Sequence, residues 1–188
     1  GIFGKYFLYV YTIEFQKRGL PHVHLIVTLA RKLLTADDID KYISAEIPDG
    51  TVNPRLKYKV LKHMTHGPHT KNTVCWDSVK GKCSKKFPKE FCDETTMAAN
   101  SYPTYRRRNN VLERNTYNGK KDGRIVNVDN SMIVPYNPRL LMMFDCHITV
   151  EYCAPVMSYK HIHKYITKGH DKLRVNVDDS NNARYDEI

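Results

Sequence analysis

The sequence of 188 residues contains no long apolar run, no internal repeat and no low-complexity segment. No stretch approaches the roughly 18 apolar residues of a membrane-spanning helix, and no signal peptide is visible. The five cysteines are an odd number without a paired framework, which favours a reducing compartment over a disulfide-stabilised fold. With 41% hydrophobic residues, the chain has enough apolar material for one full-sized core.

Acidic residues are scarce relative to basic ones, 20 against 30, and the formal net charge is +10. Residues 55–89 hold ten lysines and arginines but a single acid, Asp77. Three arginines at 106–108 follow Tyr102 and Tyr105, so cations stand beside aromatic rings on which unpaired bases could stack. This pattern favours a nucleic-acid partner over a membrane, for which no amphipathic lysine-rich helix or lipidation motif is present; a merely basic surface is the alternative. We expect nucleic-acid contacts from Lys17, Arg18, Lys85, Lys86, Tyr105, Arg106, Arg107 and Arg108.

Two histidines, His22 and His24, flank one apolar residue at the start of a predicted strand over 22–29. Alternate residues of a strand point to the same face, so the two imidazoles should converge. Two converging imidazoles form half of a divalent-metal site. The alternative is a pair of surface histidines on an edge strand.

The segment before the histidines reads as a second strand, over 6–16, because it is rich in aromatic and β-branched residues. A turn at 17–21 makes the two strands a hairpin, which places Glu14 or Gln16 across from the histidines. Oxygen and imidazole ligands with open positions suit Mg²⁺ or Mn²⁺, whereas a closed zinc site would favour thiolates. The alternative for Glu14 is a cross-strand pair with a lysine.

Residues 14–24, EFQKRGLPHVH, closely resemble the HUH motif of the Rep nuclease domain of Helitron transposases. Further segments resemble blocks of the same family in the same order, and together they extend over nearly the whole chain. These segments are ISAEIPD (43–49), HGP (66–68), GKCSKKFPK (81–89), YPTYRRR (102–108), VPYNP (134–138), HITVE (147–151) and KYITKGHD (164–171).

The resemblance implies an α+β fold with an HUH ferredoxin-like core, in which helices flank a central antiparallel sheet. It implies a metal-dependent single-stranded DNA endonuclease and strand transferase that forms a 5′-phosphotyrosine intermediate during rolling-circle transposition. The implied partner is single-stranded DNA at a transposon end, the implied metal is Mg²⁺ or Mn²⁺, and the implied location is the nucleus. It also leads us to expect that the family's first core strand precedes Gly1 and that a helicase domain normally follows in the same polypeptide.

The nucleophile is expected on a helix over about 155–168, whose apolar stripe includes Tyr159. Tyr165 lies on another face, and Lys168 follows it by just under one turn, where an ammonium group could stabilise a phenolate or bind phosphate. Because the pKa of a free tyrosine is near 10, such a neighbour helps the phenol to attack. The resemblance therefore assigns catalysis to Tyr165 and Lys168.

One departure concerns position 161. The family typically carries two tyrosines four residues apart on this helix, and here His161 occupies the first position. A single-tyrosine nuclease can still nick and rejoin, and Tyr159 could substitute for the missing tyrosine after a local shift. The change also permits a catalytically degenerate DNA-binding remnant. A third alternative is a hydrolase that uses the same metal ligands and water, without a tyrosine adduct.

The middle of the chain, 66–124, is predicted to be irregular because it is rich in glycine, proline, lysine and asparagine. Two imidazoles and two thiolates within it suit tetrahedral zinc, and a loop-rich segment gains much from a metal. Cys92 or His63 could replace one member, and free buried cysteines with surface histidines are the alternative. The four candidate ligands are His66, His69, Cys75 and Cys83.

The remaining elements follow from capping residues and periodicity. Thr35 and Asn53 are typical helix N-caps, and Pro54 suits the first helical position. We expect helices at about 36–46 and 54–65, and short strands at 125–134 and 146–153. All belong to one nuclease domain with three parts: HUH strands and following helices (1–65), a basic loop-rich insertion (66–124), and returning strands with the tyrosine helix (125–188).

Overall fold

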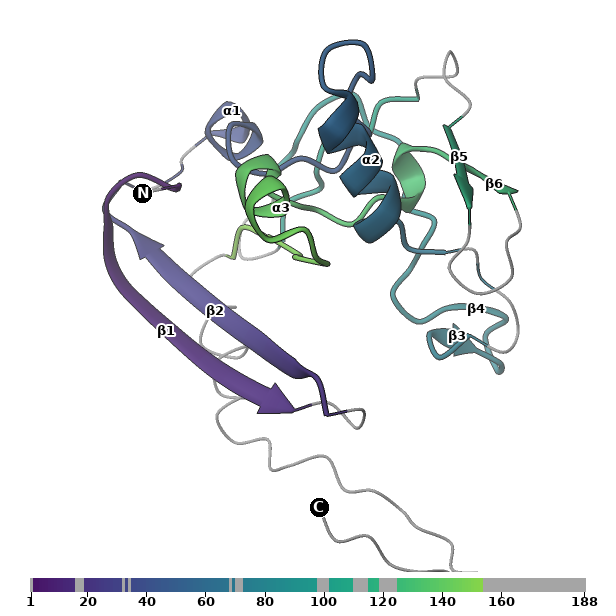
Figure 1. The fold of residues 1–188 in the computed structure, drawn as a ribbon, viewed down its shortest axis with the longest axis horizontal. Helices are drawn as coiled ribbons and strands as arrows, with labels where there is room; N and C mark the ends of the chain where they lie inside the picture. The colour runs from purple at the N-terminus through teal and green to yellow at the C-terminus, as the bar shows by residue number, and fades with distance from the viewer. Residues whose placement is uncertain are drawn as a thin grey trace, which may run out of the picture.

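The computed structural model describes residues 2–15, 19–31, 33, 35–67, 69, 73–97, 102–109, 115–118 and 125–153. The described residues form three two-stranded antiparallel sheets, three α-helices and one short 3₁₀ helix. In Figure 1 the helices gather into one body, while the first pair of strands extends away from it.

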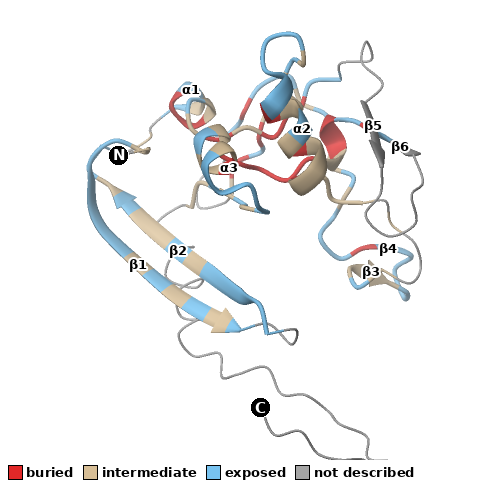
Figure 2. Cartoon of the chain, viewed as in Figure 1, coloured by how far each residue is buried: buried red, intermediate tan, exposed pale blue. Residues whose placement is uncertain are grey.

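The N-terminal hairpin pairs β1 (Tyr6–Phe15) with β2 (Pro21–Leu29), which agrees with the two strands predicted from sequence. Its register places Glu14 directly opposite His22 and Thr12 opposite His24. The connection contains Gly19 at φ 74°, a left-handed conformation that favours glycine. Figure 2 shows that no residue of this hairpin is fully buried, in contrast to the helical body.

Helices α1 (Ala36–Asp40) and α2 (Pro54–His63) begin at the predicted caps. The Thr35 hydroxyl accepts the Asp38 N–H, and the Asn53 side chain accepts the Leu56 N–H. Helix α1 is shorter than the predicted 36–46, because the chain leaves helical geometry and Ser44 pairs with Tyr136 through two backbone hydrogen bonds of 2.9 Å.

Helix α3 (Pro138–Phe144) was not among the predicted elements. It repeats the arrangement of α2, since Asn137 caps its first turn and Pro138 occupies the first helical position. Helices α2 and α3 meet over the main core, which is made of Leu56, Val60, Met64, Val128, Ile133, Val134, Tyr136 and Leu141.

The middle segment carries little regular structure, as predicted. Its described strands are β3 (Trp76–Asp77), β4 (Lys82–Cys83) and β5 (Asn115–Asn118); β3 pairs with β4, and β5 pairs with β6 (Ile125–Val128). The 3₁₀ helix η1 (Asn130–Met132) then replaces the rest of the strand predicted at 125–134.

The strand predicted at 146–153 is wrong, because these residues have no regular secondary structure and Val150 makes a single backbone hydrogen bond, to Pro135. The predicted tyrosine helix at 155–168 lies outside the described residues. The central antiparallel sheet of an HUH core also stays a prediction. Among the described residues, no helix is both long and apolar enough to cross a membrane.

Candidate functional site

The hairpin brings Glu14, His22 and His24 together as the sequence predicts. One oxygen of the carboxylate, Oε1, lies 3.1 Å from His24 Nε2 and 3.4 Å from His22 Nδ1. The nitrogen and oxygen atoms that could bind a metal all lie within 4.8 Å of one another. The side chains are 30%, 46% and 21% exposed in the order of the sequence, so a ligand can reach them.

Strand geometry explains this convergence. His22 and His24 are two residues apart on β2, which puts them on one face, and Glu14 reaches that face from the opposite strand. Two ligands at adjacent corners of an octahedral ion with bonds of roughly 2.0–2.1 Å stand about 3 Å apart. The distances from Glu14 to the two histidines fit such an ion, and three protein ligands leave further positions open.

Other residues of this predicted site fall outside the described part of the chain. Gln16, the second candidate oxygen ligand, follows β1, and Lys17 and Arg18 follow it. The predicted catalytic pair, Tyr165 and Lys168, also lies outside the described residues. The structure therefore places the three hairpin ligands relative to one another and leaves their relation to the tyrosine as a prediction.

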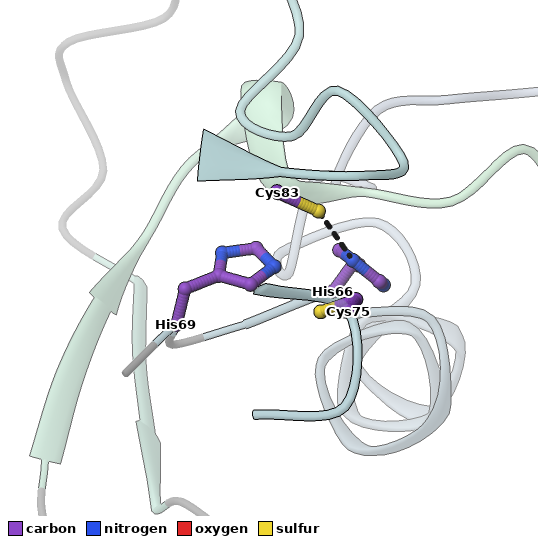
Figure 3. A group of neighbouring side chains, drawn as sticks. All are labelled: His66, His69, Cys75 and Cys83. Carbon is purple, nitrogen blue, oxygen red and sulfur yellow. Dashed lines mark hydrogen bonds between the residues drawn. The ribbon is translucent and has the colours of Figure 1, made fainter. Parts of the chain in front are cut away.

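A second group of possible metal ligands lies at the other predicted site, on the opposite side of the helical body from the hairpin (Figure 1). Figure 3 shows His66, His69, Cys75 and Cys83 turned toward a common centre, with all four ligand atoms within 4.8 Å of one another. His66 Nε2 lies 3.4 Å from Cys83 Sγ. The sequence thus identified the four residues that meet.

The surroundings favour a neutral His66. Burial, followed by the nearby charges of His69 and His147, lowers the pKa of His66 to about 4. Burial alone would raise the pKa of the Cys83 thiol, but backbone N–H groups of Phe87 and Lys85 outweigh it, so the pKa lies below its usual range. The same cluster thus offers an unprotonated imidazole and a thiol inclined to ionise.

The predicted nucleic-acid contacts divide into exposed and interior residues. Lys85 and Lys86 are exposed and follow Cys83 of the second cluster closely in the sequence. Tyr105 is 6% exposed, and its hydroxyl accepts the Tyr152 N–H at 2.7 Å. Arg107 is 4% exposed, and its Nη1 donates to the carbonyl oxygens of Asn130 and Ile133, both at 2.6 Å, and of Ala45 at 3.3 Å. The placement of Tyr105 and Arg107 differs from the prediction, because side chains enclosed in this way are not available to a ligand.

The two remaining arginines are partly exposed but already paired. Arg108 forms a forked pair with Glu46, with distances of 2.9 Å and 2.7 Å, and its backbone N–H also donates to that carboxylate. Arg106 lies 3.3 Å from Asp40 and 3.4 Å from Glu46. Sequence reasoning missed the role of Glu46, since its partner lies 62 residues away and no local motif signals the pair.

A protein-family match includes most of the N-terminal hairpin. Residues 1–27 match the family described as Helitron helicase-like domain at N-terminus. This segment includes β1 and most of β2, and with them all three hairpin ligands. The match relates this part of the chain to Helitron proteins, and no curated protein matches the chain.

Proposed function

We propose that the chain is the nuclease part of a Helitron-type transposase, a metal-dependent single-stranded DNA endonuclease and strand transferase. The observation that carries this proposal is the convergence of Glu14, His22 and His24 on one face of the hairpin, within the segment that relates the chain to Helitron proteins. A three-ligand, partly exposed cluster has the composition of a catalytic site, because it leaves room for substrate oxygen atoms.

Three residues of the N-terminal hairpin would hold the divalent ion. Glu14 would supply the oxygen ligand, and His22 and His24 would supply nitrogen ligands from one face of β2. When bound, the ion acts as a Lewis acid that polarises the scissile phosphate and offsets the negative charge of the transition state. Glu14 contacts both imidazoles through one carboxylate oxygen, which helps to orient the two rings toward a common position.

The proposed nucleophile is the phenolic oxygen of Tyr165. Its attack forms a bond to phosphorus while the bond from phosphorus to the 3′ oxygen breaks. The phenol loses its proton to solvent, and the departing oxygen gains one to become a free 3′-hydroxyl. Lys168 stabilises the developing phenolate, and a later 3′-hydroxyl reverses the step and rejoins the strand.

Binding of the DNA strand rests on the basic charge of the chain. The net charge of +10 favours association with a polyanion, and exposed Lys85 and Lys86 add to a lysine-rich surface at residues 80–89. Lys17 and Arg18 adjoin the metal ligands in the sequence and stay proposed contacts. Affinity should therefore fall steeply as salt concentration rises.

A second candidate function is a catalytically degenerate DNA-binding remnant, which the histidine at position 161 favours. Incubation with labelled single-stranded DNA and Mn²⁺, followed by a denaturing gel, separates the candidates. A covalent adduct supports the proposed transferase, intact DNA indicates the remnant, and cut DNA without an adduct indicates a hydrolase that uses water.

Mapping the adduct tests the role of Tyr165. Tyr165→Phe keeps the ring but removes the attacking oxygen, so adduct formation should stop while DNA binding persists. Tyr159→Phe is the matched control and should retain the adduct. A nucleotide attached to Tyr159, or an adduct that survives in Tyr165→Phe, would assign the nucleophile to another residue.

A further inference from the structure

The four-residue cluster at His66, His69, Cys75 and Cys83 plays no part in the proposed nuclease chemistry. Its members come from two short segments: the two histidines follow α2, Cys75 directly precedes β3, and Cys83 ends β4. Cys83 is buried and the other three are half-buried, so the group is largely shielded from water. Four ligands with little exposure are typical of a closed structural site.

The dimensions of the cluster fit a tetrahedral zinc ion. With Zn–S near 2.3 Å and Zn–N near 2.0–2.1 Å, a nitrogen and a sulfur on the same ion stand about 3.6 Å apart. The observed separation of His66 Nε2 and Cys83 Sγ is 3.4 Å. All ligand atoms are within 4.8 Å of one another, so a small inward movement completes the coordination.

An unpartnered nitrogen points independently to a ligand. His69 Nε2 is a buried atom with no hydrogen-bond partner among the described residues, and in Figure 3 the ring is turned toward His66 and Cys83. Leaving a buried polar atom without a partner costs about 1–3 kcal/mol. A metal at the centre of the cluster would satisfy this nitrogen.

Contacts around the cluster hold the ligands in place. The Lys85 N–H donates to Cys83 Sγ at 3.3 Å, as expected of a group that supports a thiolate ligand. The ring of His66 lies between those of His69 and Phe87, with centroid distances of 4.9 Å and 4.3 Å. The Ser84 N–H donates to the Cys75 carbonyl at 2.7 Å and thereby ties the two cysteine segments together.

We propose that His66, His69, Cys75 and Cys83 bind one structural Zn²⁺, which fixes the β3–β4 hairpin to the helical body. The hairpin needs such a link, because its strands are two residues long and Val74 and Val79 are fully exposed rather than buried. The zinc would hold the five lysines of residues 80–89 in a defined place. This proposed zinc site differs in ligand type and in position from the cluster of Glu14, His22 and His24 on the β1–β2 hairpin.

The test measures metal in the full 188-residue chain carrying His22→Ala and His24→Ala, so that the N-terminal cluster cannot contribute. After purification with a reductant and dialysis, elemental analysis should find about one zinc per chain. Cys83→Ser and His69→Ala should each lower this content to below about a tenth. Cys146→Ser, which changes an exposed free thiol outside the cluster, is the matched control and should keep the zinc.

Two further measurements separate lost coordination from lost folding. His69→Cys replaces one ligand type by another and should retain zinc, because three thiolates and one imidazole also form closed sites. Cobalt(II) in place of zinc should give the visible absorption of a tetrahedral site, with thiolate charge transfer that gains intensity in His69→Cys. Zinc absent from the parent chain, or zinc kept by both Cys83→Ser and His69→Ala, would overturn the proposal.

Discussion

The two clusters of candidate metal ligands differ in most of the properties that would decide what a bound metal does. The N-terminal cluster has three candidate ligands, all nitrogen or oxygen, on an exposed hairpin. The second has four candidate ligands, two of them sulfur; Cys83 is buried and the other three are half-buried. The first arrangement would leave positions on the metal for substrate, and the second would leave none.

The difference also appears in how each cluster is held. Glu14, His22 and His24 depend only on the register of two strands, and one hairpin is sufficient to bring them together. The second cluster depends on the fold, because the His66 N–H donates to Met132 and the Lys89 N–H donates to Ser131. Changes in the core should therefore disturb the second cluster and leave the first intact.

The largest expected effect comes from removing both imidazoles of the open cluster. His22→Ala with His24→Ala should slow cleavage of single-stranded DNA by more than about a hundredfold, since loss of even outer-shell partners of a metal costs 10–100-fold. Zinc content and salt-sensitive DNA binding should stay near those of the parent chain. Gel assays of cleavage, filter binding and elemental analysis measure the three quantities.

Metal removal sharpens the same contrast. A chelator should stop cleavage rapidly, and added Mn²⁺ should restore it, whereas zinc bound to the four-ligand cluster should dissociate slowly. Full cleavage by the double histidine variant, or in excess chelator, would show that the hairpin cluster does not bind the catalytic ion.

The next effect concerns Arg107, which supports the closed cluster from the interior. Its guanidinium donates hydrogen bonds to the carbonyl oxygens of Asn130 and Ile133. The two residues between them, Ser131 and Met132, accept the backbone hydrogen bonds from Lys89 and His66. Arg107→Met should lower the free energy of unfolding by about 3 kcal/mol, because buried carbonyls lose their donor. Chemical denaturation measures this loss.

A metal titration then separates the two clusters in the same variant. Zinc affinity should fall in Arg107→Met, whereas Mn²⁺ affinity of the N-terminal hairpin should not change. Equal losses at both clusters would contradict the idea that the hairpin is held independently of the core.

The inward orientation of Arg107 could not be predicted from the local sequence. The local signals were sufficient for the hairpin, for the caps at Thr35 and Asn53, and for the residues of both clusters. Each of these depends on neighbours in the chain or on residue chemistry. A run of three arginines, by contrast, gives no indication of which side chain turns inward.

Burial of Arg107 is decided by carbonyl groups that lie 23 to 62 residues away in the chain. The pair of Glu46 and Arg108 is equally distant, at 62 residues. Helix α3 is a different case, because Asn137 and Pro138 carry the same start signal that identified α2. The sequence therefore carries a start signal for α3 as well as for α2.

A smaller effect is expected from Glu14. Glu14→Ala should slow cleavage by about tenfold to a hundredfold and raise the Mn²⁺ concentration needed for half-maximal activity, because the two imidazoles can still bind an ion weakly. Glu14→Asp keeps the charge on a shorter side chain and should lie between the parent and Glu14→Ala. Unchanged dependence on Mn²⁺ in Glu14→Ala would assign the oxygen ligand to another residue, such as Gln16, the other candidate predicted from sequence.

The smallest effect is expected from the pair formed by Glu46 and Arg108. Burial would raise the pKa of Glu46, but hydrogen bonds and charge from Arg108 outweigh it, so the pKa lies below the ordinary value of 4.5. A depressed carboxyl pKa gives stability that is present above the ordinary value and is lost as the pH falls through the folded value.

Glu46→Gln should therefore lower the free energy of unfolding by about 1–2 kcal/mol at pH 7, a moderate figure because the side chain of Arg108 is half-exposed. The difference from the parent chain should shrink as the pH falls below about 4.5, where the parent carboxylate becomes protonated. Thermal unfolding across this pH range measures the convergence. A difference that stays constant down to pH 3 would mean that Glu46 acts through packing rather than charge, and the acid sensitivity of the core would then have another source.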